Sequence, residues 1–457
     1  MLEVPLTSEQ AWFLNVIYPE VWNPNRWTMT ALYQLPHDVD CRTVEDAVRD
    51  IWNAHSSLRA TFSHSRDGWR QRIAERPEAV PFRRFDARAI PRDQTRIVAE
   101  QIAVEVSRMV NVEAGRLARF ALVVPGAGDP PYLVMSIHHL VVDGISFEIL
   151  ERDLEAAYKS RSSGKVFASN SLPFEEYANK IQEFSKSSEL ERELKHWIDL
   201  PWEDLTRIPT RAPTYNVDSV RNARNQSVNI PVDAANRIAY EVPRDLGATA
   251  QDLLIAAAVD SVTSLSGRDL CVKIVHNGRV ITCDSPVENH RRESDARSHL
   301  LHPRVANTVG WLATCGAVVL PSRGEHDAAT YIKRIRDAMR SIPNNGISFG
   351  LLRWVGRPDL MRERIDANAW GPQLQFNFVG RSRKEEPDRF LRRLSVPSEE
   401  SYSAHSTPPE LGVIAQFYDQ GLRTIWSYDR HLHEESMINS FTSRFRDALW
   451  EYSKIGE

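Results

Sequence analysis

A strand, a polar turn and a helix follow one another between residues 132 and 157, and this order constrains the fold most. Tyr132–Met135 is apolar and typical of a buried strand. From Ser146 onward apolar residues recur at helical spacing. The turn between them reads His138-His139-Leu140-Val141-Val142-Asp143-Gly144, so the pattern His-His-x-x-x-Asp-Gly sits where a strand passes into a helix. Such turns often expose reactive side chains.

The residue types in this turn suit proton chemistry. An imidazole can act as a base or carry a proton near neutral pH. Asp143 can lock the turn through an ion pair, and Gly144 lets the backbone approach a ligand closely.

The overall composition excludes several classes of partner. The chain has 457 residues and a formal net charge of −4, so it is long enough for two lobes and lacks the basic surplus of a nucleic-acid-binding protein. No apolar run approaches the roughly 18 residues needed to span a membrane, and the first residues show no signal-peptide pattern. We therefore expect neither a nucleic-acid nor a membrane partner.

The cysteines are few and widely spaced, and none forms a C-x-x-C pair. They are Cys41, Cys271, Cys283 and Cys315. This usage predicts a cytoplasmic protein with free thiols and without a zinc site.

Strand-like and helical patterns alternate along the chain, which predicts an α/β protein. We expect strands at 118–124, 132–138, 227–231, 271–275 and 422–428. We expect helices at 44–54, 97–109, 174–197, 249–265 and 434–453. The segment 283–304 is charged, rich in histidine and predicted to be irregular.

Several motifs together resemble the condensation domains of nonribosomal peptide synthetases. They occur in the family's order and cover essentially the whole chain: Pro5–Gln10, His55–Phe62, His138–Gly144, Asn307–Leu312 and Gln375–Gly380. The third is the signature of acyl transferases that use one histidine and no protein nucleophile. The resemblance implies two lobes similar to chloramphenicol acetyltransferase, set in a V around a tunnel. We expect residues 1–180 to form the N-terminal lobe and 181–457 the C-terminal lobe.

Within the family, the segments 139–146, 308–311 and 348–353 resemble the epimerization subtype. In that subtype a glutamate four residues before the arginine of a Gly-Arg pair supplies a second acid/base. Here the pair is Gly278-Arg279 and the glutamate's place is taken by Val275, which cannot move a proton. We therefore expect no epimerization. Because the chain begins with Met and ends after the last family helix, we also expect a freestanding condensation enzyme.

The resemblance assigns roles to the turn residues. It implies that His139 is catalytic and contacts the acceptor, although a lone buried histidine is more often packed core. His138 is expected to be structural, held by backbone hydrogen bonds, and Asp143 to pair with Arg59 of the second motif. Gly144 is either a turn glycine or, at the start of the following helix, a stabiliser of the thioester oxyanion.

The sequence offers weaker candidates for tunnel, metal-binding and carrier-binding residues. The family motifs place Trp311 and Asn377 along the tunnel, although Trp311 also suits plain core. The spacing of His290, His299 and His302 fits no common zinc site, so we expect no metal. The basic residues Arg381, Arg383 and Lys384 suit either an acidic carrier protein or a solvated surface.

The leading hypothesis for function is an acyltransferase that joins a carrier-bound acyl or aminoacyl thioester to an amine or alcohol. The resemblance implies no bound cofactor, since the donor arrives on the phosphopantetheine of an acyl or peptidyl carrier protein. Two alternatives stay open. One is an acyl-CoA-dependent acyltransferase of the same superfamily, and the other is an idle domain that recruits a partner.

Overall fold

The fold comes from a computed structural model, which describes residues 1–19, 23–75, 79–126, 128–211, 223–264, 266–279, 303–364, 373–382, 389–396 and 411–456. Contacts divide the chain into two compact units. The first contains Met1–Phe184 and the described residues of 296–313 and 385–402, and the second contains the rest. The division thus falls four residues after the boundary expected at 180, and two later segments return to the first unit.

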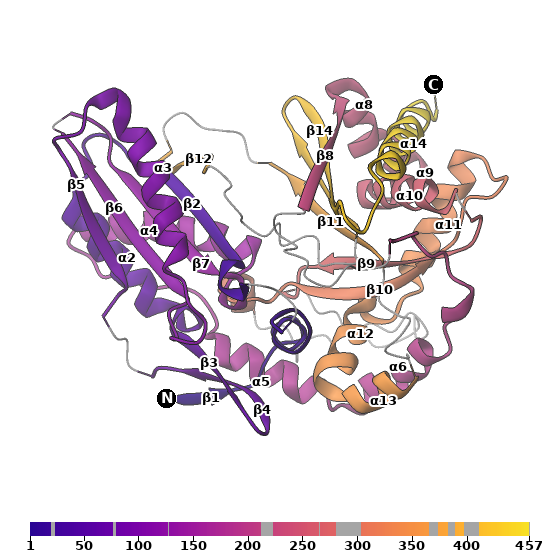
Figure 1. Cartoon of the computed structure of the whole chain (residues 1–457), viewed down its shortest axis with the longest axis horizontal. Coiled ribbons are helices and arrows are strands. Elements are labelled where there is room, and N and C mark those ends of the chain that lie inside the picture. Colours follow the sequence, from indigo (N-terminus) through magenta and orange to yellow (C-terminus); the bar gives the residue numbers. More distant parts are fainter. Residues whose placement is uncertain are drawn as a thin grey trace. The chain divides into compact units, whose positions relative to one another are not determined.

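The first unit is built on a five-stranded sheet (Figure 1). Its order is β12 (Arg392–Leu394), β2 (Thr28–Gln34), β7 (Tyr132–His138), β6 (Ala118–Pro125) and β5 (Phe82–Ala87). Neighbouring strands are antiparallel except β5 and β6, which are parallel. The strand β7 is buried along its whole length and delivers His138 at its end.

Helices cover both faces of this sheet. On one face, Ala99 and Ala103 of α3 (Arg92–Arg108) pack with Ala121 of β6 in a buried cluster. On the other, Trp52 of α2 (Cys41–Ala54) lies edge-on to Phe120, with ring centroids 6.4 Å apart. Because side chains alternate along a strand, these two neighbours on β6 point to opposite faces. The helix α4 (Gly144–Ser162) packs beside α2.

A second, three-stranded sheet in the same unit has the order β1 (Leu2–Val4), β4 (Gly68–Ile73), β3 (Ala60–Ser65). Two short helices flank it, α1 (Ser8–Trp12) and the 3-10 turn η3 (Ser56–Arg59). The helix α5 (Phe174–Phe184) completes the unit. Thr7 caps α1 in a capping box with Gln10.

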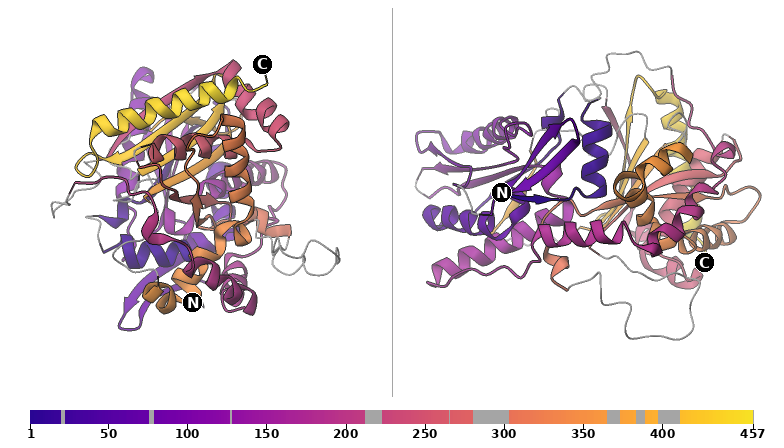
Figure 2. Two further views of the ribbon diagram at one scale, coloured as in Figure 1. Left: turned by 90° about the vertical axis from the view of Figure 1, so that its right-hand side faces the viewer. Right: turned by 90° about the horizontal axis from the view of Figure 1, so that it is seen from below.

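The second unit contains a mixed six-stranded sheet. Its order is β10 (Thr314–Leu320), β9 (Leu270–His276), β11 (Leu374–Arg381), β13 (Leu411–Tyr418), β14 (Gly421–Asp429) and β8 (Ala223–Pro231). The long helix α14 (Glu435–Ser453) lies beside α10 (Ala250–Thr263) (Figures 1 and 2). Trp426 of β14 packs on Phe445 of α14, with centroids 5.4 Å apart.

The strands and helices expected from the sequence are present, but one of the helices is divided and several elements were not predicted. The helix expected at 174–197 is two helices, α5 and α6 (Ser188–Ile198). Ser187 begins the second helix, because its side chain accepts a hydrogen bond from the backbone N–H of Leu190. The sequence patterns miss several elements: β1, β2, β4, β5, β10, β11, β12, β13 and the helix α11 (Ala328–Arg340). The segment 283–304 lies almost entirely outside the described residues.

The structure can be compared with two expectations drawn from the composition, one on membrane spans and one on the cysteines. No helix within the described ranges is both long and apolar enough to cross a bilayer. Cys41, Cys271 and Cys315 are free thiols, and Cys283 lies outside the described residues.

Candidate active site

The turn after β7 separates the two adjacent histidines into different environments. His138 is fully buried, and both of its ring nitrogens have backbone partners. Its Nε2 lies 2.9 Å from the carbonyl oxygen of Pro24, and its Nδ1 accepts from the backbone N–H of Leu140 at 3.1 Å. Burial lowers the pKa of His138 to about 3, so the ring is neutral and fixed in one orientation.

His139 is held by its backbone, and one nitrogen of its ring has no partner among the described residues. Its backbone N–H donates to the carbonyl of Trp27 at 2.8 Å, which anchors the turn to the start of β2. Its ring packs against Trp311, with centroids 4.4 Å apart. Its Nδ1 is buried and has no hydrogen-bond partner among the described residues. Burial lowers the pKa of His139, and hydrogen bonding to the backbone of His139 and Val142 together with the Asp143 carboxylate opposes this only in part. The ring is therefore neutral at pH 7 and able to accept a proton.

Asp143 is the hydrogen-bond centre of the site. Its Oδ1 accepts from the backbone N–H and the hydroxyl of Ser146, both at 2.8 Å, and so caps α4. Its Oδ2 accepts from the backbone N–H groups of Leu312 at 3.1 Å and Ala313 at 2.9 Å. One buried carboxylate thus joins the turn, the helix and a segment far away in the sequence.

Ser146 reinforces the same connection. Its Oγ accepts from the backbone N–H of Gly310 at 3.1 Å and lies 2.9 Å from the Gly310 carbonyl. Gly310 is required here, because a Cβ would lie 2.4 Å from Cδ2 of Phe174. Thr308 adds a hydrogen bond from its hydroxyl to the carbonyl of Leu172 at 2.9 Å. These contacts fix the segment that carries Trp311.

Residues of the first family motif, Pro5–Gln10, also hold the turn and the segment that carries Trp311 through hydrogen bonds. Gln10 is fully buried, and its Nε2 donates to the carbonyl of Leu140 at 2.7 Å and to Oε1 of Gln71 at 2.8 Å. Thr7 donates from its hydroxyl to the carbonyl of Trp311 at 3.3 Å. The sequence patterns assign no site role to Gln10 or Ser146. Ser146 could have been recognised, because the N–H three residues after a capping aspartate is its usual hydrogen-bond donor.

The ion pair expected between Arg59 and Asp143 is wrong. The Arg59 guanidinium donates to four backbone carbonyls instead, those of Trp52, Asn53, His55 and Ala74. Asp143 is already occupied by the donors of Ser146, Leu312 and Ala313, and no ion pair joins it to Arg59 in the described structure.

The second motif is linked to α4 by a different pair. Nε2 of His55 lies 3.0 Å from Oδ2 of Asp153, and both side chains are buried. Arg152 and Ser169 also contact the Asp153 carboxylate.

Gly144 begins α4 with an ordinary right-handed backbone. It is not among the glycines with positive φ, so the turn itself does not demand glycine. Nothing lies within 4 Å of the point where a Cβ would be, and the residue is exposed. The first turn of α4 is therefore open to a ligand, and unpaired N–H groups at a helix start favour negative charge.

The remaining candidates lie elsewhere or outside the described residues. Asn377 is half-buried on β11 in the second unit, opposite Ile414 of β13. In the same unit Arg381 stacks over the rings of Tyr240 and Phe417, at 5.3 and 5.7 Å. Arg383, Lys384, His290, His299 and His302 lie outside the described residues. Within the described part, no three His, Cys, Asp or Glu side chains group as metal ligands.

The comparisons with known proteins decide the family. A model of the condensation domain matches residues 2–454. The chain belongs to the condensation domain family. It is 24% identical, over all of its length, to part of a linear gramicidin synthase protein of Brevibacillus parabrevis, and it spans 6% of that protein. It is 26% identical, over 98% of its length, to part of tyrocidine synthase 2 of the same organism, and it spans 12% of that protein. The predicted resemblance is therefore confirmed.

Solved structures show the same fold. The epimerization domain from the third module of tyrocidine synthetase B matches with a TM-score of 0.79 and 23% identity, covering 99% of this chain and 97% of that one. The X-domain of teicoplanin biosynthesis, solved with OxyB, matches with a TM-score of 0.70 and 18% identity, covering 100% and 94%. The predicted α/β fold, similar to chloramphenicol acetyltransferase, is confirmed.

The corrected pairing gives a first prediction. His55→Gln and Asp153→Asn should be non-additive in a double-mutant cycle of unfolding free energies, with a coupling between about 0.5 and 3 kcal/mol, because the two side chains touch. The matched control is the cycle of Arg59→Gln and Asp143→Asn, which should be additive within about 0.5 kcal/mol. Coupling in the control cycle and none in the first would favour a direct pair between Arg59 and Asp143.

The environment of His138 gives a second prediction. Because its folded pKa lies below the unfolded value of about 6.5, only the unfolded chain takes up this proton as the pH falls. The wild-type protein should therefore lose about 2 kcal/mol more stability than His138→Gln between pH 7 and pH 5. Denaturant unfolding of both proteins at the two pH values measures the difference, and equal losses would show that His138 is not held neutral.

Proposed function

We propose that this condensation domain joins a carrier-bound acyl or aminoacyl thioester to an amine or alcohol, with His139 as the catalytic base. The observation that carries the proposal is the contrast between the two histidines. His138 uses both ring nitrogens for the fold, whereas His139 is neutral and keeps a buried Nδ1 without a partner among the described residues. A buried polar atom that the fold leaves without a partner calls for an explanation, and a catalytic role supplies one.

The reaction needs one proton carrier. The acceptor nitrogen or oxygen attacks the thioester carbonyl while its proton passes to the imidazole of His139. The tetrahedral oxyanion is stabilised by the first turn of α4 beside Gly144, where the open space lets the substrate approach the backbone. The intermediate then expels the thiolate, which takes the proton back from the imidazolium.

The described neighbours of His139 offer no competing protein nucleophile. The hydroxyl of Ser146 is fully buried and engaged with Asp143 and Gly310, so it holds the fold in place. Asp143 is likewise occupied by four donors and acts as a positioning residue. Direct transfer from the thioester to the acceptor therefore suits the site better than an acyl-enzyme intermediate.

The intact turn supports catalysis over the idle-domain alternative. The hydrogen bonds of Gln10, Ser146 and Asp143 all hold the turn that presents His139, and the family signature His-His-x-x-x-Asp-Gly is complete in this chain. The donor is proposed to arrive on the phosphopantetheine arm of a carrier protein, and the domain itself requires no bound cofactor.

His139→Ala tests the proposal directly. We expect kcat/KM for product formation to fall about 10²–10⁴-fold, the usual contribution of a positioned base. The matched control is His64→Ala, an exposed histidine of the same unit, which should retain full activity. Circular dichroism and thermal unfolding establish that both variants fold. A folded His139→Ala variant within a few-fold of wild type would remove His139 from the reaction.

The donor gives a further prediction. A docked carrier supplies binding energy remote from the reacting carbonyl, which can be used to orient it. We expect kcat/KM to be at least about 10-fold higher for the acyl group on its carrier than for the same group on coenzyme A, with one acceptor held fixed. Equal values would favour the acyl-CoA-dependent alternative.

A further inference from the structure

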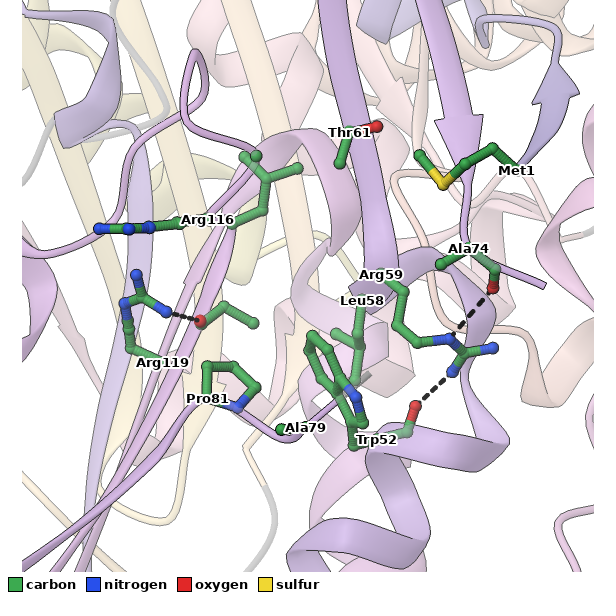
Figure 3. Close-up of a pocket in the computed structure, with 13 residues that line it drawn as sticks. Met1, Trp52, Leu58, Arg59, Thr61, Ala74, Ala79, Pro81, Arg116 and Arg119 are labelled. Atoms are coloured by element: carbon green, nitrogen blue, oxygen red, sulfur yellow. Dashed lines mark hydrogen bonds between the residues drawn. The ribbon is translucent and has the colours of Figure 1, made fainter. Parts of the chain in front are cut away.

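A cavity of about 190 Å³ lies in the first unit, and none of its lining residues belongs to the histidine turn, residues 138–144 (Figure 3). It is bounded by the end of α2, the 3-10 turn η3, the start of β3 and the chain leading into β6. Its apolar wall includes Trp52, Leu58, Pro81 and Leu117. Its lining also contains three arginines, Arg59, Arg116 and Arg119, and no acidic residue among those described.

The three arginines are not equivalent. Arg59 is used by the fold, because it donates to carbonyls of the α2 end and of Ala74. In Figure 3, Arg116 and Arg119 lie at the left and Arg59 lies to the right of Pro81 and Leu58. The charge available to a ligand is therefore that of Arg116 and Arg119.

These two guanidinium groups carry positive charge that no described carboxylate balances. Neither makes an ion pair with any residue of the described ranges. Arg119 donates from Nε to the carbonyl of Met109 at 3.3 Å and from Nη1 to the carbonyl of Ala118 at 3.5 Å, and its Nη2 makes no hydrogen bond to the described residues. Burial lowers the pKa of Arg119, and the like charges of Arg116 and Arg83 lower it further. An anion bound here would relieve this repulsion.

The backbone holds both arginines in place. Arg116 exchanges two backbone hydrogen bonds with Asn111, each of 2.8 Å. Gly115 has a φ of +63°, and a Cβ there would lie 2.8 Å from Cγ2 of Thr61, so this turn is closely packed and depends on glycine. Arg119 lies on β6 and is paired with Ser136 of β7.

We propose that this cavity binds a small organic oxyanion, with its carboxylate or phosphate on Arg116 and Arg119 and its apolar body against Trp52, Leu58 and Pro81. Guanidinium groups suit both kinds of oxyanion. An engineered apolar cavity of about 150 Å³ binds benzene. The volume here therefore matches one ring with a short anionic arm. This site is separate from the condensation reaction and does not depend on His139.

Binding is tested by ¹⁹F NMR titration of the full chain with 4-fluorophenylacetate and, separately, 4-fluorophenyl phosphate. The neutral reference is 4-fluorophenylacetamide, which has the same body without the charge. We expect saturable binding of at least one anion, at least about 10-fold tighter than the amide. Binding of either anion supports the proposal, and the tighter one identifies the preferred anionic group.

Variants show whether the arginines cause this preference. Arg119→Gln and Arg116→Gln should each weaken anion binding at least about 5-fold and leave amide binding unchanged. The matched control is Arg84→Gln, an exposed arginine of β5 that does not line the cavity, and it should bind as wild type does. Arg116 is also exposed, so its replacement provides a folded variant even if Arg119→Gln does not fold.

Three outcomes would overturn the proposal. The first is the absence of saturable binding of either anion. The second is equal affinity for the anions and the amide. The third is a folded Arg116→Gln variant with wild-type affinity for both anions.

Discussion

The buried carboxylate of Asp143 is the interaction on which the candidate site depends. It accepts four hydrogen bonds, two from Ser146 and one each from Leu312 and Ala313. A carboxylate removed from water is stable only when its oxygens are satisfied, and hydrogen bonds to a charged acceptor are the stronger kind. Its position as the residue before α4 lets one side chain cap the helix and bind a second segment.

The catalytic role proposed for His139 depends on the same hydrogen bonds. The strand β7 ends at His138, whose ring is immobilised by backbone groups, and the next residue is turned toward Trp311. Two chemically identical side chains thus differ in role, because both nitrogens of one have partners while Nδ1 of the other has none among the described residues. Gln10 and Thr7 extend the same support to the turn and to Trp311 from the first helix.

Local sequence patterns were sufficient to predict the strand and the helix that flank the histidine turn. The strand expected at 132–138 is β7, and the helix expected after the turn is α4. Both could be predicted because a buried strand and a helix each show their pattern within a short stretch of sequence. The partners of Asp143 could not be predicted, since Leu312 and Ala313 are 169 and 170 residues away along the chain. The ion pair predicted between Arg59 and Asp143 is wrong because the sequence patterns do not show the actual partners of either side chain. The Arg59 guanidinium binds carbonyls that the end of α2 leaves unpaired within the helix.

We propose that this chain forms a bond at the thioester carbonyl and does not exchange the α-proton. Val275 lies on β9 opposite Cys315. The resemblance predicts that the epimerization subtype has its second acid/base at this position, and a valine side chain cannot carry a proton. The most direct test is mass spectrometry of a carrier-bound L-aminoacyl thioester incubated with the enzyme and an acceptor in D₂O. Our account predicts condensed product without deuterium at the α-carbon beyond the enzyme-free control. Enzyme-dependent α-deuteration without condensed product would contradict it.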